Sequence, residues 1–335
     1  MLTTPLTRMF SIDHPIVQAG MSSDCGAPLA AAVSIAGALG TIGTIGRSPA
    51  NLEQELSAMM RATRSPWSVN IVTFDWAPFA GDLLDVAIAA RPAAITLSFG
   101  DSRPAIERCR AAGIPVIAQV QGFEQATAVL KARPDVLVVQ GNEAGGHTGS
   151  RGTLGFAAQV LGVAGDVPVL VAGGVGNGRG LAAALAMGAA GAVMGTRFKA
   201  TEEFGTPQTG HLDLQRAAIV ANNGDATVWD EITDIAIGMK WPQGIAGRVL
   251  SNRFTGTWLG RRDALRTEVA AQSDSSAWSA ANTSAPDTLL NWAGESAGLV
   301  HEILPAAEVV RRTVEDAESL LRQLSGVLSD GGSRA

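Results

Sequence analysis

The chain has 335 residues, of which 46% are hydrophobic and 17% charged, and its formal net charge is −6 at pH 7. This length allows one large α/β domain with an insertion, or two ordinary domains, and the acidic balance without any Lys/Arg-rich run argues against nucleic acid as a partner. The two cysteines, Cys25 and Cys109, lie far apart without a CxxC spacing, which argues against a zinc site or a disulfide framework and favours a reducing cytoplasm.

One stretch, residues 25 to 46, carries no charge and is long enough to raise the question of a membrane span. Pro28 and several glycines interrupt it and predict a short helix, a turn and a strand instead. The N-terminal residues lack the uninterrupted apolar run of a secretory signal. We therefore expect a cytoplasmic protein without membrane association.

Short apolar segments recur along the first 200 residues, each followed by a segment of helical composition. Eight of them are candidate strands: 15–20, 37–43, 67–72, 93–99, 114–120, 135–140, 167–174 and 190–198. Their hydrophobicity is continuous rather than alternating, as in strands that are buried on both faces. A repeated order of strand and helix predicts a parallel sheet. Eight such units favour an α/β fold of the (β/α)8 TIM-barrel type, with an open doubly wound sheet as the alternative.

The pattern changes after the eighth segment. Residues 205–285 contain several tryptophans and no strand of the earlier kind, and we expect them to form a mostly helical insertion near the C-terminal face of the barrel, with the Ser/Ala-rich residues 272–286 as a loose exit. The barrel itself would comprise residues 1–204 and 286–328. An apolar stripe at helical spacing predicts a last helix that docks on the barrel, formed by Val310, Val314, Ala317, Leu321, Leu324 and Leu328. Residues 329–335 are expected to be a disordered tail.

Two glycine-bearing loops follow the seventh and eighth candidate strands. Gly173 and Gly174 precede an alanine-rich helical segment, and Gly195 and Thr196 end the next strand. In TIM barrels these two loops often bind phosphate, because backbone N–H groups and a helix N-terminus converge there on an anion. The alternative is that the glycines only make tight turns. Neither a GxGxxG fingerprint nor a Walker A loop is present.

Polar or soft side chains lie at or near the ends of other candidate strands, namely Gln18, Met21, Asn70, Gln119 and Gln140. Carboxamides both donate and accept hydrogen bonds, which suits the edge of a flavin or nicotinamide ring, whereas a metal ion would require carboxylates, cysteines or several histidines. For each amide alone, the alternative is a buried side chain whose hydrogen bonds are satisfied within the protein.

His147 follows Gly145 and Gly146 in the sequence "VVQGNEAGGHTG", which places it on the loop after the sixth strand and at the mouth of the barrel. A histidine in this position can act as a base or a hydrogen-bond donor near neutral pH. The alternative is a histidine that only holds the loop in place. For Glu143 in the same loop we expect a structural role, with its carboxylate accepting hydrogen bonds from backbone N–H groups.

Together, the segments "PIVQAGMSS", "QGNEAGGHTG", "VPVLVAGGVGNGRG" and "GAVMGTRFKATEE" resemble the nitronate monooxygenase family, formerly called 2-nitropropane dioxygenases. The resemblance runs from about residue 8 to 204 and returns at "LLNWAGESAGLVHEI". It implies an FMN-binding TIM barrel in which His147 is the catalytic histidine and Trp292 is a candidate pocket residue. The residues that it assigns to flavin are Ala19, Gly20, Met21, Asn70, Gln119, Gln140, Gly145, Gly146, Ala172, Gly173, Gly174, Gly195 and Thr196.

The resemblance implies oxidation of alkyl nitronates by O2 to a carbonyl compound and nitrite, without a metal ion. His147 would bind the nitro group or remove the α-proton of a neutral nitroalkane. FMN-dependent enoyl-acyl carrier protein reductases and NADH:quinone reductases share nearly the same motifs, so an NAD(P)H-using reductase is the alternative. A flavin-binding barrel without catalytic turnover is the alternative from another class.

Overall fold

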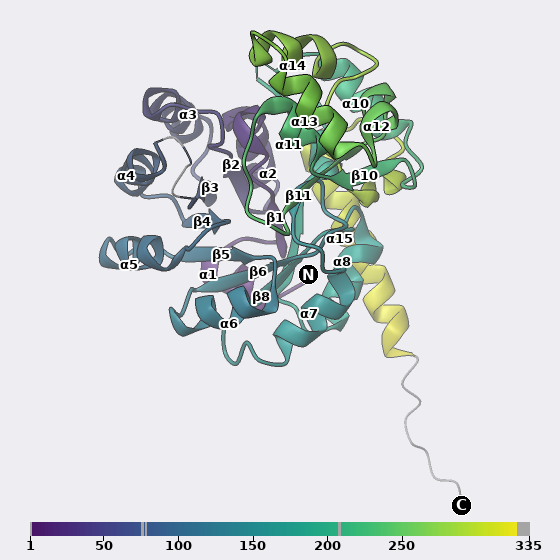
Figure 1. Ribbon diagram of the computed structural model, residues 1–335. Coiled ribbons are helices and arrows are strands. Elements are labelled where there is room, and N and C mark those ends of the chain that lie inside the picture. Colours follow the sequence, from purple (N-terminus) through teal and green to yellow (C-terminus); the bar gives the residue numbers. More distant parts are fainter. Residues whose placement is uncertain (1, 75–76, 78, 207–208, 327–335) are drawn as a thin grey trace, which may run out of the picture.

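Eight parallel strands form the centre of the protein in a computed structural model that describes residues 2–74, 77, 79–206 and 209–326 (Figure 1). They are β1 (Ile16–Gln18), β2 (Gly40–Ile42), β3 (Trp67–Val72), β4 (Ala94–Ser98), β5 (Val116–Val120), β6 (Val136–Gln140), β8 (Val169–Ala172) and β9 (Gly191–Met194). Each one lies within a predicted segment, and nearly every strand residue is buried, as the continuous hydrophobicity indicated.

The strands follow the order β1-β9-β8-β6-β5-β4-β3-β2, with every pair parallel. Leu39, directly before β2, joins the two ends of this order, because Gln18 N–H donates to its carbonyl at 2.9 Å and its own N–H donates to Ile16 at 3.0 Å. The prediction of a TIM-like barrel is therefore confirmed, and the open doubly wound sheet is wrong.

Two layers of apolar side chains hold the barrel together. Its interior packs residues such as Val17, Ile117 and Leu170, and helix α1 (Pro5–Phe10) adds Leu6 and Phe10 to the same cluster. The larger cluster lies between the strands and the surrounding helices. These helices are α2 (Ala27–Ile35), α3 (Pro49–Ala62), α4 (Ala80–Ala90), α5 (Arg103–Ala111), α6 (Phe123–Lys131), α7 (Thr153–Leu161), α8 (Gly178–Ala186) and α9 (Thr196–Lys199).

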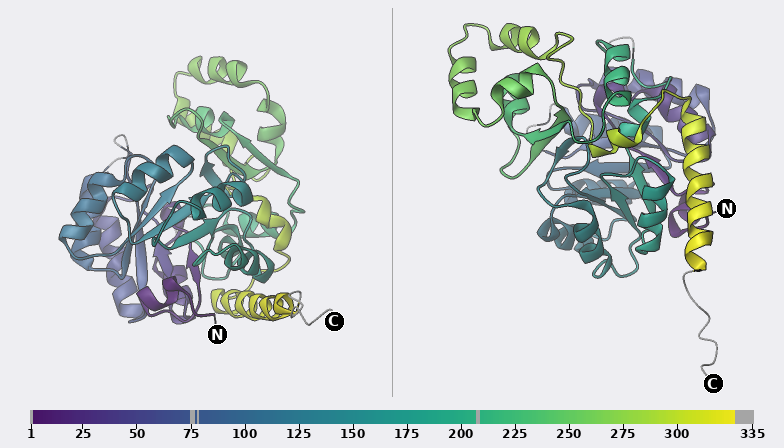
Figure 2. Two further views of the ribbon diagram at one scale, coloured as in Figure 1. Left: turned by 90° about the horizontal axis from the view of Figure 1, so that it is seen from below. Right: turned by 90° about the vertical axis from the view of Figure 1, so that its right-hand side faces the viewer.

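The last helix, α15 (Ala306–Ser325), packs along the outside of the barrel against α8 and α2, as predicted (Figure 2). Val310, Val314 and Ala317 are buried in this contact. The predicted stripe is wrong at Leu324, which is 47% exposed near the end of the helix. Leu328 and the predicted tail 329–335 lie outside the described residues.

The insertion stands over one end of the barrel (Figure 1). It contains α10 (Leu212–Val220), β10 (Thr227–Asp230), α11 (Ile232–Ile237), β11 (Ala246–Leu250), α12 (Arg253–Trp258), α13 (Arg262–Ala270) and α14 (Ser275–Thr283). The sequence indicated its helices but not its strands, which pair with β7 (Gly146–Thr148) from a barrel loop in the antiparallel order β10-β11-β7. The predicted loose exit is also wrong, because Asp274 accepts hydrogen bonds from Ser276 N–H and Ala277 N–H and so caps α14.

Two 3₁₀ segments complete the elements: Ser22–Asp24 after β1 and Glu295–Leu299 on the chain returning from the insertion. The predicted helix, turn and strand within residues 25–46 are confirmed as α2 and β2. Within the described ranges, no helix combines the length and apolar character needed to cross a membrane.

Candidate active site

A cavity of about 280 Å³ opens at the C-terminal ends of the barrel strands, beneath the insertion. This volume is close to the lower end of the range for small-molecule sites, about 300–1,000 Å³. All the residues that the sequence analysis assigned to cofactor, catalysis or substrate line this one cavity: Ala19, Gly20, Met21, Asn70, Gln119, Gln140, Gly145, Gly146, His147, Ala172, Gly173, Gly174, Gly195, Thr196 and Trp292. The structure thus brings them together, while their individual roles stay predictions.

Three glutamines form a connected group on the barrel side of the cavity. Gln140 Oε1 accepts hydrogen bonds from Gln119 Nε2 at 2.9 Å and from Gln121 Nε2 at 2.5 Å. Gln121 also donates to the carbonyl of His147 at 2.9 Å, which ties the glutamines to the loop that carries the histidine. Since Gln140 Nε2 makes no hydrogen bond to any described residue, it can donate to a ligand.

Asn70 and Gln18 use their carboxamides differently. Asn70 Nδ2 donates to Ser98 Oγ at 3.0 Å, beside the cavity wall. Gln18 borders the cavity but is fully buried, and its side chain binds both the N–H and the carbonyl of Thr41, at 2.9 and 3.1 Å. The expectation that Gln18 offers its amide to a ligand is therefore wrong, because neighbouring backbone satisfies it.

The first glycine loop has the backbone that glycine alone adopts without strain, with φ of +106° at Gly173 and +74° at Gly174. A Cβ at Gly174 would lie 2.4 Å from Glu143 Oε2. Glu143 accepts a hydrogen bond from Thr153 N–H at 2.8 Å, so its predicted structural role is confirmed. This loop therefore presents backbone rather than side chains to the cavity.

The helix after this loop contributes less to anion binding than the sequence indicated. Its N-cap residue, Asn177, accepts hydrogen bonds from Arg179 N–H at 3.1 Å and Gly180 N–H at 3.3 Å. These N–H groups at the start of α8 are thus already satisfied. An anion in the cavity would instead bind the N–H groups of the glycine loops themselves.

The second glycine loop and the returning chain meet at the same wall. Thr196 Oγ1 accepts a hydrogen bond from Gly294 N–H at 2.9 Å. A Cβ at Gly145 would lie 2.6 Å from the backbone of Ala293 and Gly294, so this close approach requires glycine. The chain that follows the insertion therefore fixes the position of both the second glycine loop and the loop that carries His147.

His147 lies on β7 and forms a short hydrogen bond with Asp234 of the insertion, Nε2 to Oδ1 at 2.6 Å. The two side chains are only 10% and 6% exposed. Burial raises the pKa of Asp234 above its ordinary value of 3.8, and the hydrogen bond with His147 opposes this rise. A histidine beside a buried carboxylate is the arrangement in which a ring is oriented and its tautomer is fixed.

Aromatic rings enclose the histidine. The indole of Trp241 stacks on the imidazole with centroids 3.8 Å apart and planes 15° apart, and the centroid of Trp292 lies 4.9 Å away. Phe99 meets Trp241 edge to face, at 4.8 Å between centroids. These rings exclude water from one side of the imidazole, and they offer an apolar surface to a substrate.

A buried lysine also lines the cavity. Lys199, at the end of α9, is 4% exposed, and its Nζ donates to the carbonyl of Trp292 at 3.3 Å. Burial lowers the pKa of Lys199 to about 8. The side chain is therefore still mostly an ammonium at neutral pH.

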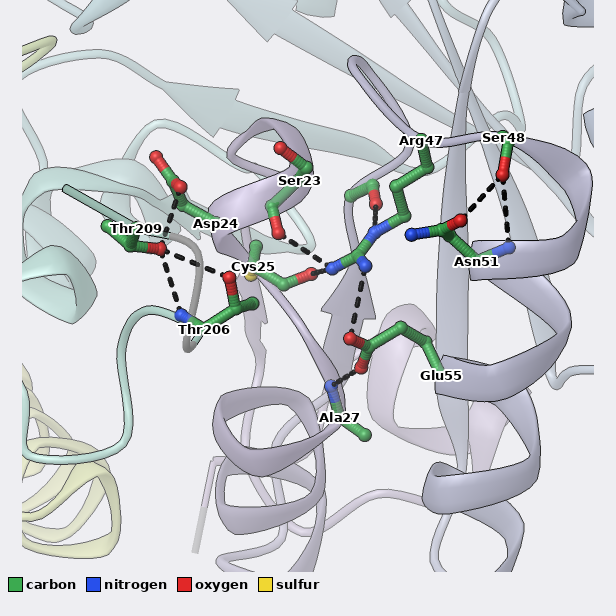
Figure 3. A network of polar contacts seen from close by, with 11 residues as sticks. Ser23, Asp24, Cys25, Ala27, Arg47, Ser48, Asn51, Glu55, Thr206 and Thr209 are labelled. Atoms are coloured by element: carbon green, nitrogen blue, oxygen red, sulfur yellow. Dashed lines mark hydrogen bonds and ion pairs between the residues drawn. The ribbon is translucent and has the colours of Figure 1, made fainter.

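A network beside the cavity holds the segment after β1 (Figure 3). The guanidinium of Arg47 donates to Ser23 O at 2.7 Å and to Gly43 O at 2.9 Å, and it pairs with Glu55 at 3.0 Å. Glu55 in turn accepts from Ala27 N–H at 2.7 Å. Because the Met21 end of this segment lines the cavity, the network fixes part of the cavity wall.

Sequence reasoning missed four residues here: Gln121, Asp234, Trp241 and Lys199. Gln121 was visible, since it follows a candidate strand as the other amides do. Asp234 and Trp241 carry no local signal, because their position depends on the pairing of β11 with β7. Lys199 lies within a motif that was recognised, but its burial cannot be inferred from a helix of a single turn.

A flavin fits the groups that line this cavity. Free amide donors, exposed glycine backbone and aromatic rings suit a planar heterocycle with a polar edge and a phosphate. Gly20 supports a close approach of backbone, because a Cβ there would lie 2.5 Å from Asn70 Cβ. In the part of the chain that the structure describes, no group of three or more His, Cys, Asp or Glu residues could hold a metal ion.

Comparisons with known proteins agree with this fit. A dehydrogenase of Rhodococcus jostii, (3aS,4S,5R,7aS)-5-hydroxy-7a-methyl-1-oxo-octahydro-1H-indene-4-carboxyl-CoA dehydrogenase, is 38% identical over 209 residues, which cover 62% of this chain but only 58% of that protein. A probable nitronate monooxygenase of Staphylococcus saprophyticus is 31% identical over 62% of this chain and 71% of that protein.

Solved structures resemble the whole chain. FabK from Thermotoga maritima has a TM-score of 0.83 and 28% identity, over 98% of this chain and all of that one. Nitroalkane oxidase from Streptomyces ansochromogenes has a TM-score of 0.79 and 27% identity, over 96% and 100%. The family model described as nitronate monooxygenase matches residues 3–83 and 76–316. The chain therefore belongs to the nitronate monooxygenase family of flavin-dependent oxidoreductases.

Proposed function

We propose that this protein binds FMN and oxidises alkyl nitronates with O2, releasing a carbonyl compound and nitrite. The single observation that carries the proposal is the buried contact of His147 with Asp234, 2.6 Å long, because His147 lines the same cavity as Gln119, Gln140 and the two glycine loops. The family membership and the likeness to a nitroalkane oxidase support the same chemistry. We expect a small-molecule substrate and O2 as the partners, and neither nucleic acid nor membrane.

The contact with Asp234 supports different tasks for the two ring nitrogens of His147. An ionised Asp234 can only accept a hydrogen bond, so Nε2 must carry the hydrogen in their contact. Nδ1 then has a free lone pair, and among the described residues it has no hydrogen-bond partner. Nδ1 is therefore the atom that would take the α-proton of a neutral nitroalkane.

The other residues position the substrate against this nitrogen. Trp241 stacks on one face of the imidazole, and the ring of Trp292 lies 4.9 Å from it, so the imidazole cannot turn freely. After proton transfer, Asp234 stabilises the imidazolium and an anionic nitronate lies beside it. Bound FMN would supply the redox chemistry, in which electrons pass from the nitronate to oxygen.

Oxygen uptake and nitrite release test the proposal directly. Purified protein reconstituted with FMN is mixed with 2-nitropropane, the neutral nitroalkane that still carries the α-proton, and the rates of oxygen uptake and nitrite release are measured together. We expect both at a fixed ratio in the wild-type protein and a loss of both in His147→Ala, with FMN still bound. Unchanged turnover in His147→Ala would show that His147 is not catalytic, whereas a wild-type protein that binds FMN without turnover would favour a non-catalytic flavin-binding barrel.

A second candidate, a flavin-dependent oxidoreductase acting on acyl thioesters, is favoured by the 38% identity to the CoA dehydrogenase and by the likeness to FabK. Here NAD(P)H or its oxidised form would be the second substrate. Anaerobic mixing with nitronate, NADH and NADPH in separate experiments distinguishes the two functions. Loss of the flavin absorption band with nitronate alone supports nitronate oxidation, whereas loss with NADH or NADPH alone supports the reductase.

A further inference from the structure

Lys199 is a buried cation that nitronate chemistry at His147 does not use. It lies on α9, a helix of four residues that begins at Thr196. It is 4% exposed, and it lines the same cavity as the two glycine loops. A buried ammonium is strongly unfavourable unless hydrogen bonds or an opposite charge compensate for its lost hydration.

The protein compensates this charge only in part. Its ammonium donates one long hydrogen bond, to Trp292 O at 3.3 Å, and lies 5.7 Å from the ring centroid of Phe204. The carboxylate that acts on it electrostatically is Asp24, but Asp24 Oδ1 is bound by Thr209 Oγ1 at 2.8 Å (Figure 3). Across the described ranges, Lys199 forms no ion pair. At least one of its three N–H donors is thus available to a ligand.

Its place in the fold indicates which part of a ligand it meets. Lys199 and Thr196 both bind the chain that returns from the insertion, Lys199 at Trp292 O and Thr196 at Gly294 N–H. The Lys199 N–H donates to the carbonyl of Gly195 at 3.0 Å, so the lysine follows directly on the second glycine loop. Backbone N–H groups together with one ammonium are the donors by which proteins bind phosphate.

We propose that Lys199 is the cation of a phosphate subsite in this cavity and makes the protein select FMN over riboflavin. This inference rests on the flavin binding proposed above and adds the residue that recognises the phosphorylated form. A phosphate beside Lys199 would supply the counter-charge that the protein lacks. Because its buried charge is uncompensated until phosphate binds, Lys199 destabilises the flavin-free protein and stabilises the FMN-bound protein.

Lys199→Met tests this directly, because methionine keeps the approximate length of the side chain and removes the charge. Lys131→Met is the matched control, since Lys131 is exposed at the end of α6, away from the cavity, and its loss changes the net charge equally. Flavin is removed, and FMN and riboflavin are titrated separately against each protein by flavin fluorescence. The thermal unfolding of each flavin-free protein is recorded at the same pH.

We expect Lys199→Met to weaken FMN binding about ten- to a hundredfold, the usual effect of losing a charge-assisted hydrogen bond, and to leave riboflavin binding within about threefold. The flavin-free variant should unfold at a higher temperature than the wild type. A merely structural lysine would give the opposite temperature shift. Lys131→Met should change neither flavin affinity nor the unfolding temperature.

Two results would overturn the inference: equal loss of FMN and riboflavin affinity in Lys199→Met, which would place the lysine at the ring, or unchanged affinity for both. Wild-type protein that binds FMN and riboflavin equally well would also overturn it. These outcomes differ from failure of the proposed function, in which the wild-type protein binds neither flavin or binds FMN without oxidising nitronate.

Discussion

The barrel and the insertion contribute to one cavity in different ways. Apart from β1, which pairs with β9, barrel strands pair with the next strand or the next but one along the chain, and their loops supply glycine backbone and carboxamides. The insertion supplies Asp234 and Trp241, and its strand β11 pairs with β7 from far earlier in the chain. The part of the site suited to a cofactor thus comes from the barrel, whereas the environment of His147 depends on the insertion.

His147 lies where the two regions join. It belongs to a barrel loop, yet its strand partner is Gly247 and its hydrogen-bond partner is Asp234, both in the insertion. Arg248 strengthens the same junction, with hydrogen bonds from its guanidinium to Asn142 O at 2.7 Å and an ion pair with Glu295 at 3.1 Å. Burial of this pairing gives the histidine one fixed orientation, which a free glycine-rich loop would lack.

The largest effect is expected from His147→Ala, which should affect catalysis but not the binding of the cofactor by the barrel. His147→Ala should lower kcat/KM for a neutral nitroalkane about 10²- to 10⁴-fold, the range for loss of a general base. FMN affinity should change little, because the glycine loops and the glutamine group do not depend on the imidazole. Steady-state oxygen uptake and flavin titration measure the two properties. A parallel loss of flavin would show that the cofactor and catalytic parts of the cavity are not separable.

A smaller effect is expected at the partner in the insertion. Asp234→Asn removes the charge that orients His147 and stabilises its protonated form, so kcat should fall about 100-fold. FMN affinity should stay within about threefold, because no barrel group changes. Retention of full activity would mean that the aromatic rings alone orient the histidine.

The pH profile sharpens the same comparison. Because burial raises the pKa of Asp234, this carboxyl gains its proton at a higher pH than an ordinary one as the pH falls. A protonated Asp234 no longer attracts the Nε2–H of His147 with a full negative charge. Wild-type kcat should therefore decline as the pH falls, and the decline should begin at a pH above 3.8, the ordinary pKa of an aspartate. In Asp234→Asn the part of this acid limb that comes from the carboxyl should disappear, and kcat measured at closely spaced pH values for both proteins checks it.

Features of the fold and the site could be predicted from the sequence where they depend on neighbouring residues, but not where they depend on contacts between residues far apart in the chain. The barrel strands could be predicted from local hydrophobicity, and the loop of Gly173 and Gly174 from its position at the end of a predicted strand. Asp234 could not be recognised, because it lies in a short amphipathic helix and meets His147 only through the register of β11 and β7. The sheet of the insertion was missed for the same reason. Helix α14 was also missed, but it could have been predicted from the sequence, because Asp274 is a typical N-cap residue.

The charge state of Lys199 provides a test of cofactor binding by the barrel that does not involve the insertion residues Asp234 and Trp241. Burial lowers the pKa of Lys199 to about 8, so the ammonium loses its proton as the pH rises through this value. Apparent FMN affinity should therefore fall about tenfold between pH 7 and pH 9, while riboflavin affinity stays nearly constant. Lys199→Met should abolish the difference between the two flavins. Equal pH dependence for both would contradict a phosphate contact.

The smallest effect is expected from a change in the junction itself, at Gly247. Its backbone lies opposite His147 in the sheet, and an added Cβ would lie 2.3 Å from Cζ3 of Trp292. Gly247→Ala should push this indole against the imidazole and raise KM for nitronate about three- to tenfold, with a smaller change in kcat. FMN affinity should stay constant, because none of the glycine loops moves.

Gly256→Ala is the matched control for this change, because Gly256 lies in α12 of the same insertion and an added Cβ would meet no atom within 4 Å. It should leave KM unchanged and stabilise the protein by a few tenths of a kcal/mol, since alanine favours a helix over glycine. If Gly247→Ala behaves like Gly256→Ala, the indole can shift without affecting the histidine. If KM rises only in Gly247→Ala, Trp292 transmits the packing of the insertion to the substrate position.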